Sequence, residues 1–240
     1  MKKEKMTNNK QLVIGAGEIG TSVYNVLNPH YNISIRDKED DIDSKYDILH
    51  ICYPPIDNFI EVTKEYIKQY DPSLVIVHST VSPGTTRKIG DLAVHSPVRG
   101  VHPHLEEGIE TFVKYFGGKK SKEAAKIFSD IDIKTKSFNK PETTELLKIL
   151  STTYYAWNVV FQKEVKRICD EHELDFDDVY TTPSKDYNEG YKKLDMEHVT
   201  RPVLKHMPGP IGGHCLLPNC ELLNDWLTET IKGRNKKYQE

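Results

Sequence analysis

A cysteine near the carboxyl end of the chain has the surroundings best suited to covalent chemistry. Cys215 ends the run P-G-P-I-G-G-H-C, and a helix is expected just beyond it, over 221–231. Glycines let the backbone approach a ligand, and a nearby helix N-terminus favours the thiolate, which is the nucleophilic form of the side chain. A buried structural cysteine in a tight turn fits this segment equally well, so both interpretations stay open here.

A second glycine-rich segment lies near the amino end and has the spacing of a dinucleotide site. The apolar run 11–14 leads into G-x-G-x-x-G at Gly15, Gly17 and Gly20, and a helix is expected over 21–27. In this motif the first glycine makes the tight turn and the second lets a pyrophosphate approach. The third lets the helix pack on the strand.

An acidic residue follows the glycines at the distance typical of NAD-binding folds. Asp37 comes after a short strand expected over 33–35, where an acid takes the ribose hydroxyls of NAD. Arg36 and Lys38 flank this acid and could accept a 2′-phosphate. The sequence therefore predicts NAD as the cofactor, with NADP as the alternative.

The elements that must position these residues alternate between strands and helices. Further strands are expected over 47–52, 74–78, 92–95 and 133–138, and further helices over 58–70 and 123–131. This alternation predicts an α/β fold with a Rossmann-type, doubly wound parallel sheet. Ligands bind outside the carboxyl ends of such strands, so the loops 52–55 and 79–86 are expected at the cofactor site.

From Pro141 the pattern becomes helical. Residues 142–172 contain no proline or glycine, which predicts one long spine helix, and the segment 187–191 is expected in a loop. We predict three parts: a flexible tail over 1–10, a dinucleotide-binding domain over 11–139, and a mainly helical dimerisation and substrate domain over 140–240. The apolar side chains of the spine helix predict a two-fold homodimer.

Composition argues against several classes of partner and location. The net charge is −3 and no long Lys/Arg run occurs, which argues against nucleic acid. No apolar run approaches the ~18 residues of a membrane span, and no signal peptide is recognisable. The four cysteines form no disulfide framework, so we expect a cytoplasmic protein that acts on a small molecule.

Several histidines and one arginine are candidates for binding. Six histidines and cysteines are of the types that bind zinc: His95, His102, His104, His214, Cys215 and Cys220. Their spacing matches no metal-binding motif, so no metal is expected. His102 and His104 are instead expected beside the nicotinamide or an anionic substrate. Arg99 could grip a carboxylate or phosphate, with a solvated surface position as the alternative.

Several short motifs occur in the order found in one enzyme family. Besides the glycine loop they are Cys52–Pro55, S-T-V-S-P-G-T from Ser79, F-G-G followed by E-A-A, E-L-L-K ending at Lys148, and G-G-H-C ending at Cys215. Together they resemble the UDP-glucose/GDP-mannose dehydrogenase family, within the 6-phosphogluconate dehydrogenase-like superfamily. Relative to that family the chain is expected to be shortened and to lack the C-terminal nucleotide-binding domain.

The resemblance implies roles for particular residues. Family members oxidise a sugar-nucleotide alcohol twice with NAD, which would make Cys215 the nucleophile, Lys148 the oxyanion stabiliser and Thr80 a partner of the catalytic water. The candidate cofactor-binding residues are Gly15, Gly17, Glu18, Ile19, Gly20, Asp37, Tyr53, Pro54 and Ser79. The candidate substrate-binding residues are Arg99, His102, Thr152, Gly212, Gly213 and His214.

Three positions depart from the family pattern. Val98, Thr152 and Asn219 stand where the family has a glutamate, an asparagine and an aspartate. Carboxylates help water attack a thioester, whereas hydride transfer needs only a bound cofactor and an oriented alcohol. We therefore predict an NAD-dependent oxidoreductase acting on a sugar nucleotide or a smaller hydroxylated acid, with one or two oxidation steps. The alternative is a catalytically reduced dinucleotide-binding protein that senses or sequesters its ligand.

Overall fold

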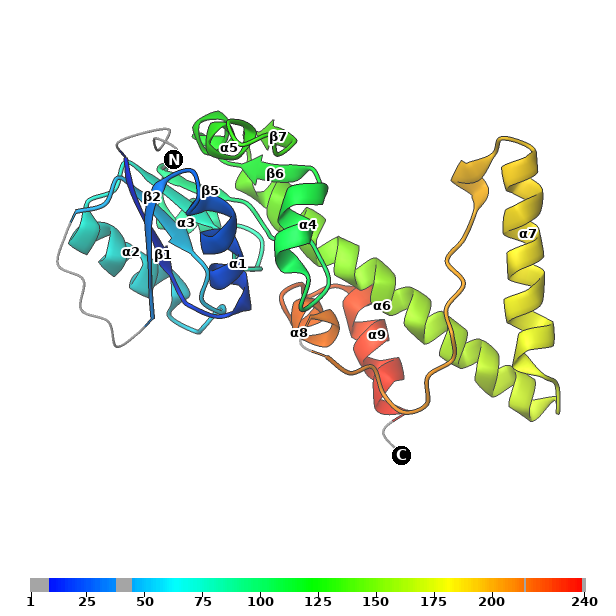
Figure 1. Ribbon diagram of the computed structural model, residues 1–240. Coiled ribbons are helices and arrows are strands. Elements are labelled where there is room, and N and C mark those ends of the chain that lie inside the picture. The colour runs from blue at the N-terminus through cyan, green and yellow to red at the C-terminus, as the bar shows by residue number, and fades with distance from the viewer. Residues whose placement is uncertain (1–8, 38–44, 214, 239–240) are drawn as a thin grey trace. The chain divides into compact units, whose positions relative to one another are not determined.

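The computed structural model describes residues 9–37, 45–213 and 215–238 (Figure 1). The chain divides into two compact units, Met1–Lys148 and Ile149–Glu240. The division falls inside the long helix α6 (Pro141–Glu171), which confirms the predicted spine helix. The boundary predicted after residue 139 lies just before this helix begins.

The N-terminal unit is built on one seven-stranded sheet with the order β2-β1-β3-β4-β5-β6-β7. The strands are β1 (Lys10–Ile14), β2 (Asn32–Arg36), β3 (Ile48–Ile51), β4 (Leu74–Val77), β5 (Ala93–His95), β6 (Lys114–Gly117) and β7 (Thr135–Phe138). Their order reverses between β2 and β3, on either side of β1, as in a doubly wound sheet. This confirms the predicted Rossmann-type fold.

Helices cover both faces of this sheet. They are α1 (Glu18–Leu27), α2 (Phe59–Tyr70), α3 (Thr85–Ile89), α4 (Leu105–Thr111) and α5 (Ser121–Ser129). Successive residues of a strand point to opposite faces. Val13 accordingly lies in one core cluster with residues of α1, α4 and α5, and its neighbours Leu12 and Ile14 lie in another with residues of α2 and α3.

Two details of this unit differ from the sequence prediction. The sheet is not wholly parallel, because β6 runs antiparallel to β5 and pairs with it through His95 and Gly117. The flexible tail was predicted to reach residue 10, but Lys10 is already part of β1 and pairs with Asn32 of β2. The backbone N–H of Lys10 also donates to Asp47 Oδ2 at 2.8 Å. Residues 1–8 of that tail lie outside the described residues.

The C-terminal unit is helical, as predicted. Beyond its part of α6 it holds η1 (Asp177–Thr181), α7 (Thr182–Lys193), η2 (Glu197–Val199), α8 (Leu216–Glu221) and α9 (Trp226–Lys236). A small core joins α6, α8 and α9 through Ala156, Val160, Cys220 and Ile231. None of the helices that the structure describes is long and apolar enough to cross a membrane.

Two predictions for this unit were wrong. The helix expected over 221–231 is two helices, because the chain breaks after Glu221 and Asp225 starts a new one, its side chain accepting a hydrogen bond from Leu227 N at 2.9 Å. The segment 187–191 is not a loop but part of α7, which has a proline in its first turn, where proline is well tolerated.

Candidate functional site

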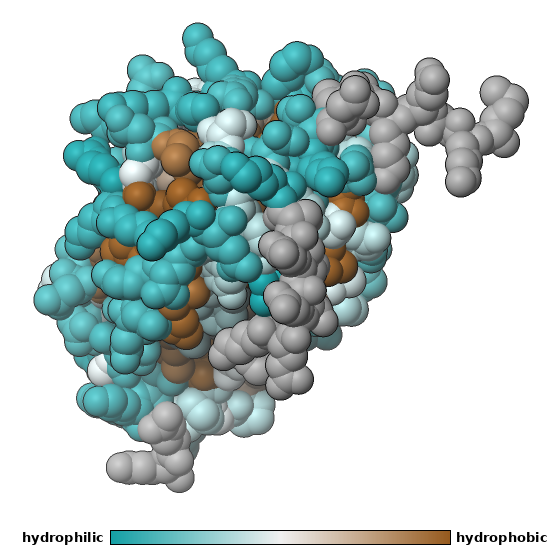
Figure 2. All heavy atoms as spheres, turned by 90° about the vertical axis from the view of Figure 1, so that its left-hand side faces the viewer, coloured by the Kyte–Doolittle hydropathy of each residue, from teal (hydrophilic) through white to brown (hydrophobic). Residues whose placement is uncertain are grey.

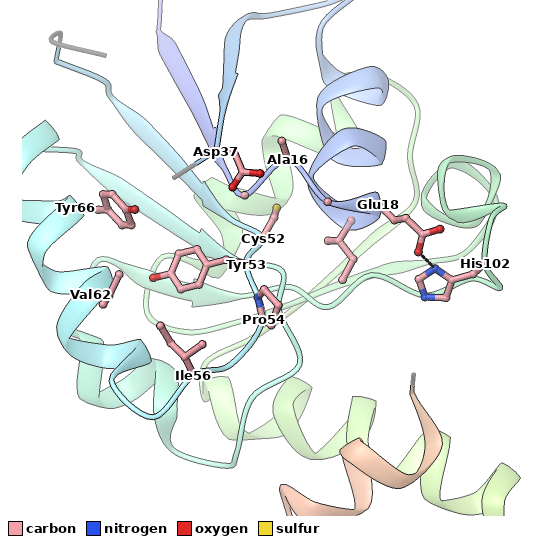
Figure 3. Close-up of a pocket in the computed structure, with 13 residues that line it drawn as sticks. Ala16, Glu18, Asp37, Cys52, Tyr53, Pro54, Ile56, Val62, Tyr66 and His102 are labelled. Carbon is pink, nitrogen blue, oxygen red and sulfur yellow. Dashed lines mark ion pairs between the residues drawn. The ribbon is translucent and has the colours of Figure 1, made fainter. Parts of the chain in front are cut away.

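A pocket of about 500 Å³ opens beside the carboxyl ends of β1, β2 and β3 in the N-terminal unit. Its lining residues are Gly15, Ala16, Gly17, Glu18, Ile19, Asp37, Cys52, Tyr53, Pro54, Ile56, Val62, Tyr66 and His102 (Figure 3). The reversal of strand order in a doubly wound sheet is where ligands bind. The face of the molecule seen in Figure 2 is mostly hydrophilic, with hydrophobic atoms set between polar side chains.

The three glycines of the loop have three different surroundings. Gly15 has a φ of +102°, and a Cβ there would lie 2.8 Å from Tyr53 N. A Cβ on Gly20 would lie 1.8 Å from Gly15 O, so α1 can approach the loop only without a side chain. A Cβ on Gly17 would meet no atom within 4 Å. Gly15 and Gly20 are therefore required by the fold, whereas the space over Gly17 is open to a ligand.

Asp37 and Arg36 lie at the end of β2 but face different surroundings. Asp37 lines the pocket, next to Ala16 of the glycine loop (Figure 3). Arg36 is only 8% exposed, donates to the Tyr70 hydroxyl, and has its guanidinium 5.6 Å from the centre of the Tyr66 ring. Lys38, the other candidate for a 2′-phosphate, lies outside the described residues.

Ser79 does not line the pocket but contacts a residue that does, Tyr53. Its hydroxyl donates to Tyr53 O at 2.6 Å and so fixes the turn after β3. The Tyr53 hydroxyl lies 2.6 Å from Thr63 Oγ1 of α2, and burial raises the pKa of Tyr53. This places Tyr53 and Pro54 as a wall between β3 and α2 (Figure 3).

An ion pair lies at another edge of the pocket. His102 Nδ1 contacts the carboxylate of Glu18, in the first turn of α1 (Figure 3). Nearby, α4 packs on α1, and Asn25 Nδ2 donates to Glu106 Oε1 at 2.5 Å. The contact with Glu18 holds His102 at the edge of the pocket. His104 is instead paired with Glu107 on an exposed surface.

The sequence prediction missed several lining residues, including Ile56, Val62 and Tyr66. Val62 and Tyr66 are four residues apart on α2 and therefore share a face of that helix. Their spacing predicted a helix, but it could not say that this face borders a pocket. Cys52 also lines the pocket, and burial raises the pKa of its thiol, which keeps it neutral.

The start of α6 belongs to the N-terminal unit and holds Lys148 in a defined place. Lys148 Nζ donates to Val98 O at 2.9 Å, while the Val98 side chain is only 4% exposed. One turn earlier, the buried Glu145 accepts hydrogen bonds from Gly84 N at 2.6 Å and Thr86 N at 2.9 Å. Glu145 thus ties the 79–86 loop, which contains the half-buried Thr80, to the helix that carries the lysine.

The guanidinium of Arg99 lies over two aromatic rings. It lies 5.2 Å from the centre of the Phe112 ring and 5.4 Å from that of Tyr115. Arginine stacks favourably on aromatic faces. The predicted contact of Arg99 with a substrate stays a prediction.

The remaining candidates lie in the C-terminal unit. Cys215 is partly exposed and directly precedes α8. Thr152 and Asn219, two of the positions that depart from the family, contact each other, with Asn219 Nδ2 donating to Thr152 Oγ1 at 3.2 Å. Gly213 has a φ of +86°. Gly212 is exposed, and His214 lies outside the described residues.

No group of three or more His, Cys, Asp or Glu side chains that could hold a metal ion occurs among residues 9–37, 45–213 and 215–238.

Comparison with known proteins agrees with the motifs. Residues 142–231 match the family model for the UDP-glucose/GDP-mannose dehydrogenase family, central domain. The UDP-N-acetyl-D-mannosamine dehydrogenase of Methanococcus vannielii is 28% identical over 153 residues, which are 60% of this chain and 33% of that protein. The corresponding protein of Methanocaldococcus jannaschii is 24% identical over 211 residues, or 77% of this chain and 45% of that protein. The chain thus spans between a third and a half of these relatives' length.

Solved structures show the same fold. The UDP-D-ManNAc dehydrogenase of Pyrococcus horikoshii aligns with a TM-score of 0.76 at 17% identity, covering 95% of this chain and 68% of that one. The 3-hydroxyisobutyrate dehydrogenase of Mycobacterium tuberculosis aligns with a TM-score of 0.67 at 13% identity, covering 96% and 93%. Motif order, family model and fold agree, and the predicted relationship is confirmed: this chain is a relative of the UDP-glucose/GDP-mannose dehydrogenase family.

Proposed function

We propose that this protein is an NAD-dependent dehydrogenase that oxidises an alcohol group of a sugar nucleotide or of a smaller hydroxylated acid. The observation that carries the proposal is the pocket at the strand-order reversal, with Gly17 open to a ligand and Asp37 at its edge. A pyrophosphate would lie over Gly17 at the start of α1, and the ribose hydroxyls would bind Asp37. NAD, when bound, would accept the hydride.

Lys148 is the proposed acid–base and oxyanion-stabilising residue. Its ammonium is fixed on Val98 O by a 2.9 Å hydrogen bond, and a positioned side chain that exchanges a proton with the reacting alcohol contributes about 10²–10⁴-fold to the rate. Cys215 is the proposed nucleophile toward an aldehyde product, and Thr80 the partner of a catalytic water. We also propose that the enzyme is a cytoplasmic homodimer.

Two substrate classes are supported by different relatives. The curated relatives are UDP-N-acetyl-D-mannosamine dehydrogenases, which favours a sugar nucleotide. A 3-hydroxyisobutyrate dehydrogenase shares the fold, and a smaller hydroxylated acid is therefore the second substrate class in the proposal. Both substrate classes present a secondary or primary alcohol to the same cofactor, so the cofactor site is common to both versions of the proposal.

A non-enzymatic dinucleotide-binding role is the alternative. It is favoured by the buried apolar Val98 and by the neutral Thr152–Asn219 pair, which stand where the family has a glutamate, an asparagine and an aspartate. A protein with this role would keep the pocket but would lack the carboxylates that activate water. Such a protein would bind NAD without reducing it.

The decisive experiment combines binding with turnover. Calorimetry should show tighter binding of NAD than of NADP, and Asp37→Ala should weaken NAD at least about tenfold, since it removes hydrogen bonds to a charged acceptor. Asp71→Ala, on the surface and paired with Lys45, is the control. Nicotinamide reduction is then screened with sugar nucleotides and hydroxy acids. Tighter NADP binding would reject the role of Asp37, and NAD binding without reduction by any substrate would favour the alternative.

A further inference from the structure

The segment just before the proposed nucleophile cannot hold its shape by its own backbone. Residues 207–213 have no regular secondary structure and contain Pro208 and Pro210, which lack N–H groups. Gly209, with a φ of +74°, and Gly213 adopt left-handed conformations. We call residues 207–213 the proline–glycine segment. Its position must be set by side chains from the helices around it.

Lys163 of α6 provides the first of these contacts. Its Nζ donates to Met207 O at 2.5 Å and to Gly209 O at 2.6 Å, and the residue is only 3% exposed. Both carbonyls belong to peptide bonds that precede a proline, so neither peptide bond has an N–H of its own. One ammonium therefore satisfies two acceptors on either side of Pro208, and charge-assisted bonds of this kind are the stronger ones.

A second contact fixes the other end of the same segment. Asn235 of α9, 2% exposed, accepts a hydrogen bond from Ile211 N at 2.6 Å through Oδ1. The Ile211 side chain is buried in the small core with Val160 and Ile231. The segment is therefore attached to two helices, at residues 207 and 209 by Lys163 and at residue 211 by Asn235 and the core.

The aromatic and acidic neighbours of Lys163 hold it in this orientation. Its Nζ lies 5.3 Å from the centre of the Tyr238 ring, and the Tyr238 hydroxyl donates to Glu164 Oε1 at 2.8 Å. Glu164 also pairs with Arg167 at 3.0 Å on α6. Lys163 itself has two carbonyls, not a carboxylate, as its hydrogen-bond acceptors. If a carboxylate bound the Lys163 ammonium instead, the carbonyls of Met207 and Gly209 would lose these hydrogen bonds.

We infer that Lys163 is a positioning residue of the proposed active site: it fixes the proline–glycine segment and thereby the place of Cys215 two residues beyond it. The catalytic consequence rests on the proposed function. The anchoring itself rests only on the contacts within the C-terminal unit. A misplacement of a reacting group by about 1 Å can cost about 10²-fold in rate.

The test compares Lys163→Met with the wild type and with Lys166→Met. Methionine keeps most of the length of the side chain but donates no hydrogen bond, whereas Lys166 pairs with Asp170 on the same helix and does not contact the segment. Hydrogen exchange at residues 211–213 should become at least about tenfold faster in Lys163→Met, because charge-assisted bonds are lost, and should be unchanged in Lys166→Met. Lys163→Arg, which can donate to two carbonyls, should restore most of the protection.

Turnover gives the second measurement. With a substrate identified for the wild type, Lys163→Met should lower kcat at least about tenfold while the KM for NAD stays within about twofold, because the cofactor site lies in the other unit. If Lys163→Met does not fold, Asn235→Ala tests the same segment through its second anchor. Exchange at residues 211–213 that stays as slow as in the wild type would overturn the inference. So would faster exchange throughout the unit, or an unchanged kcat in an active enzyme.

The two proposals can fail separately. A wild type that reduces NAD with no substrate removes the proposed function, while faster exchange confined to residues 211–213 in Lys163→Met still supports the anchor. An active wild type with no exchange difference keeps the proposed function and removes the anchor.

Discussion

At the scale of single residues, the glycine loop separates what the fold needs from what a ligand needs. Gly20 cannot carry a Cβ because Gly15 O would lie 1.8 Å away, whereas nothing lies within 4 Å of a Cβ on Gly17. A substitution at Gly20 therefore alters the packing of α1 on β1. A substitution at Gly17 alters only the space that the pyrophosphate is proposed to fill.

We predict opposite outcomes for Gly17→Ala and Gly20→Ala. Gly17→Ala should change the free energy of unfolding by no more than about 1 kcal/mol, the usual range at a helix N-cap, yet weaken NAD binding at least tenfold (roughly 1.4 kcal/mol). Gly20→Ala should lower stability by about 1–3 kcal/mol through overpacking. Urea unfolding and calorimetry measure the two effects. Unchanged NAD binding in a folded Gly17→Ala would show that the pyrophosphate does not lie there.

A second residue-scale prediction concerns the fate of an aldehyde at Cys215. Because Val98 and Asn219 replace carboxylates, oxidation of a sugar-nucleotide alcohol should stop or slow after the first hydride or at the thioester. Mass spectrometry of enzyme incubated with NAD and substrate should show an adduct on Cys215 that Cys215→Ser lacks. Adding Val98→Glu and Asn219→Asp together should speed the second step more than the first, by up to about 10²–10⁴-fold for a restored general base.

The contrary result is equally specific. Full four-electron oxidation by the unaltered chain would show that another base activates water, and Glu164 and His102 would be the next residues to substitute. A rate increase in Val98→Glu with Asn219→Asp that is equal for both steps would point to substrate positioning and not to water activation.

At the scale of secondary-structure elements, the sheet of the N-terminal unit contains a buried polar chain where such sheets are usually apolar. His50 of β3 lies 2.8 Å from Gln11 Oε1 of β1 and 3.0 Å from His78 Nε2, after β4. His78 Nδ1 lies 2.9 Å from Ser96 O and 3.5 Å from Lys114 Nζ of β6. Polar contacts thus connect successive strands from β1 to β6 through the interior.

Burial of these polar side chains makes the stability of the protein depend on pH. It lowers the pKa of Lys114 to about 7 and, together with the Lys114 charge, the pKa of His50 to about 3. Burial also lowers the pKa of His95 to about 3. A base with a lowered pKa in the folded state binds fewer protons than in the unfolded state. Stability should therefore rise with pH between the two pKa values of each group.

We predict that Lys114→Met stabilises the protein at neutral pH. Burial disfavours the charged form of Lys114, and an apolar side chain of similar length avoids that cost. We expect a gain of about 1–4 kcal/mol, the range found when buried ion pairs are replaced with apolar residues. The gain should be largest near pH 7 and below, and should shrink from pH 7 toward 10.5, the ordinary pKa of lysine, because the unfolded lysine also loses its proton there. Urea unfolding across this range measures it.

Lys126→Met is the control for this prediction, since Lys126 is an exposed lysine paired with Asp130. Its effect should stay within about 0.5 kcal/mol at every pH, as for most surface substitutions. A loss of stability in Lys114→Met, or a gain that does not depend on pH, would show that Lys114 is held as a fully satisfied cation.

At the scale of the whole molecule, the C-terminal unit exposes more apolar surface than its small core explains. Leu150, Tyr154, Phe161 and Ile168 on α6 are between 44% and 60% exposed. Their spacing of four or seven residues places them along one stripe of the helix. Trp157, partly buried, lies in the same stripe and packs beside the 72%-exposed Trp226 of α9.

We predict that this stripe forms a two-fold homodimer, because a closed interface covers the same patch on both copies. Light scattering at micromolar concentration should give twice the chain mass, and Tyr154→Glu with Phe161→Glu should give a folded monomer. Glu106→Gln, on α4 of the other unit, is the control. A wild-type monomer under these conditions would contradict the prediction.

Features that depend on local order could be predicted from the sequence alone. The β1–glycine loop–α1 unit, Asp37 after β2 and the 31-residue α6 follow from apolar periodicity, from glycines at fixed spacing and from the absence of helix breakers. Each of these signals lies within about 30 neighbouring residues. The family resemblance rested on short motifs of the same kind and was confirmed.

Which residues those elements bring together depends on the packing of the folded chain. The Ser79–Tyr53 and Lys163–Gly209 contacts join residues 26 and 46 positions apart, and the antiparallel β5–β6 pair depends on which strands become neighbours. Hydrogen-bond partners of this kind are selected by the packing of the whole unit, because a buried carbonyl or ammonium must be satisfied by whatever group lies beside it. Local sequence contains no signal for that neighbour.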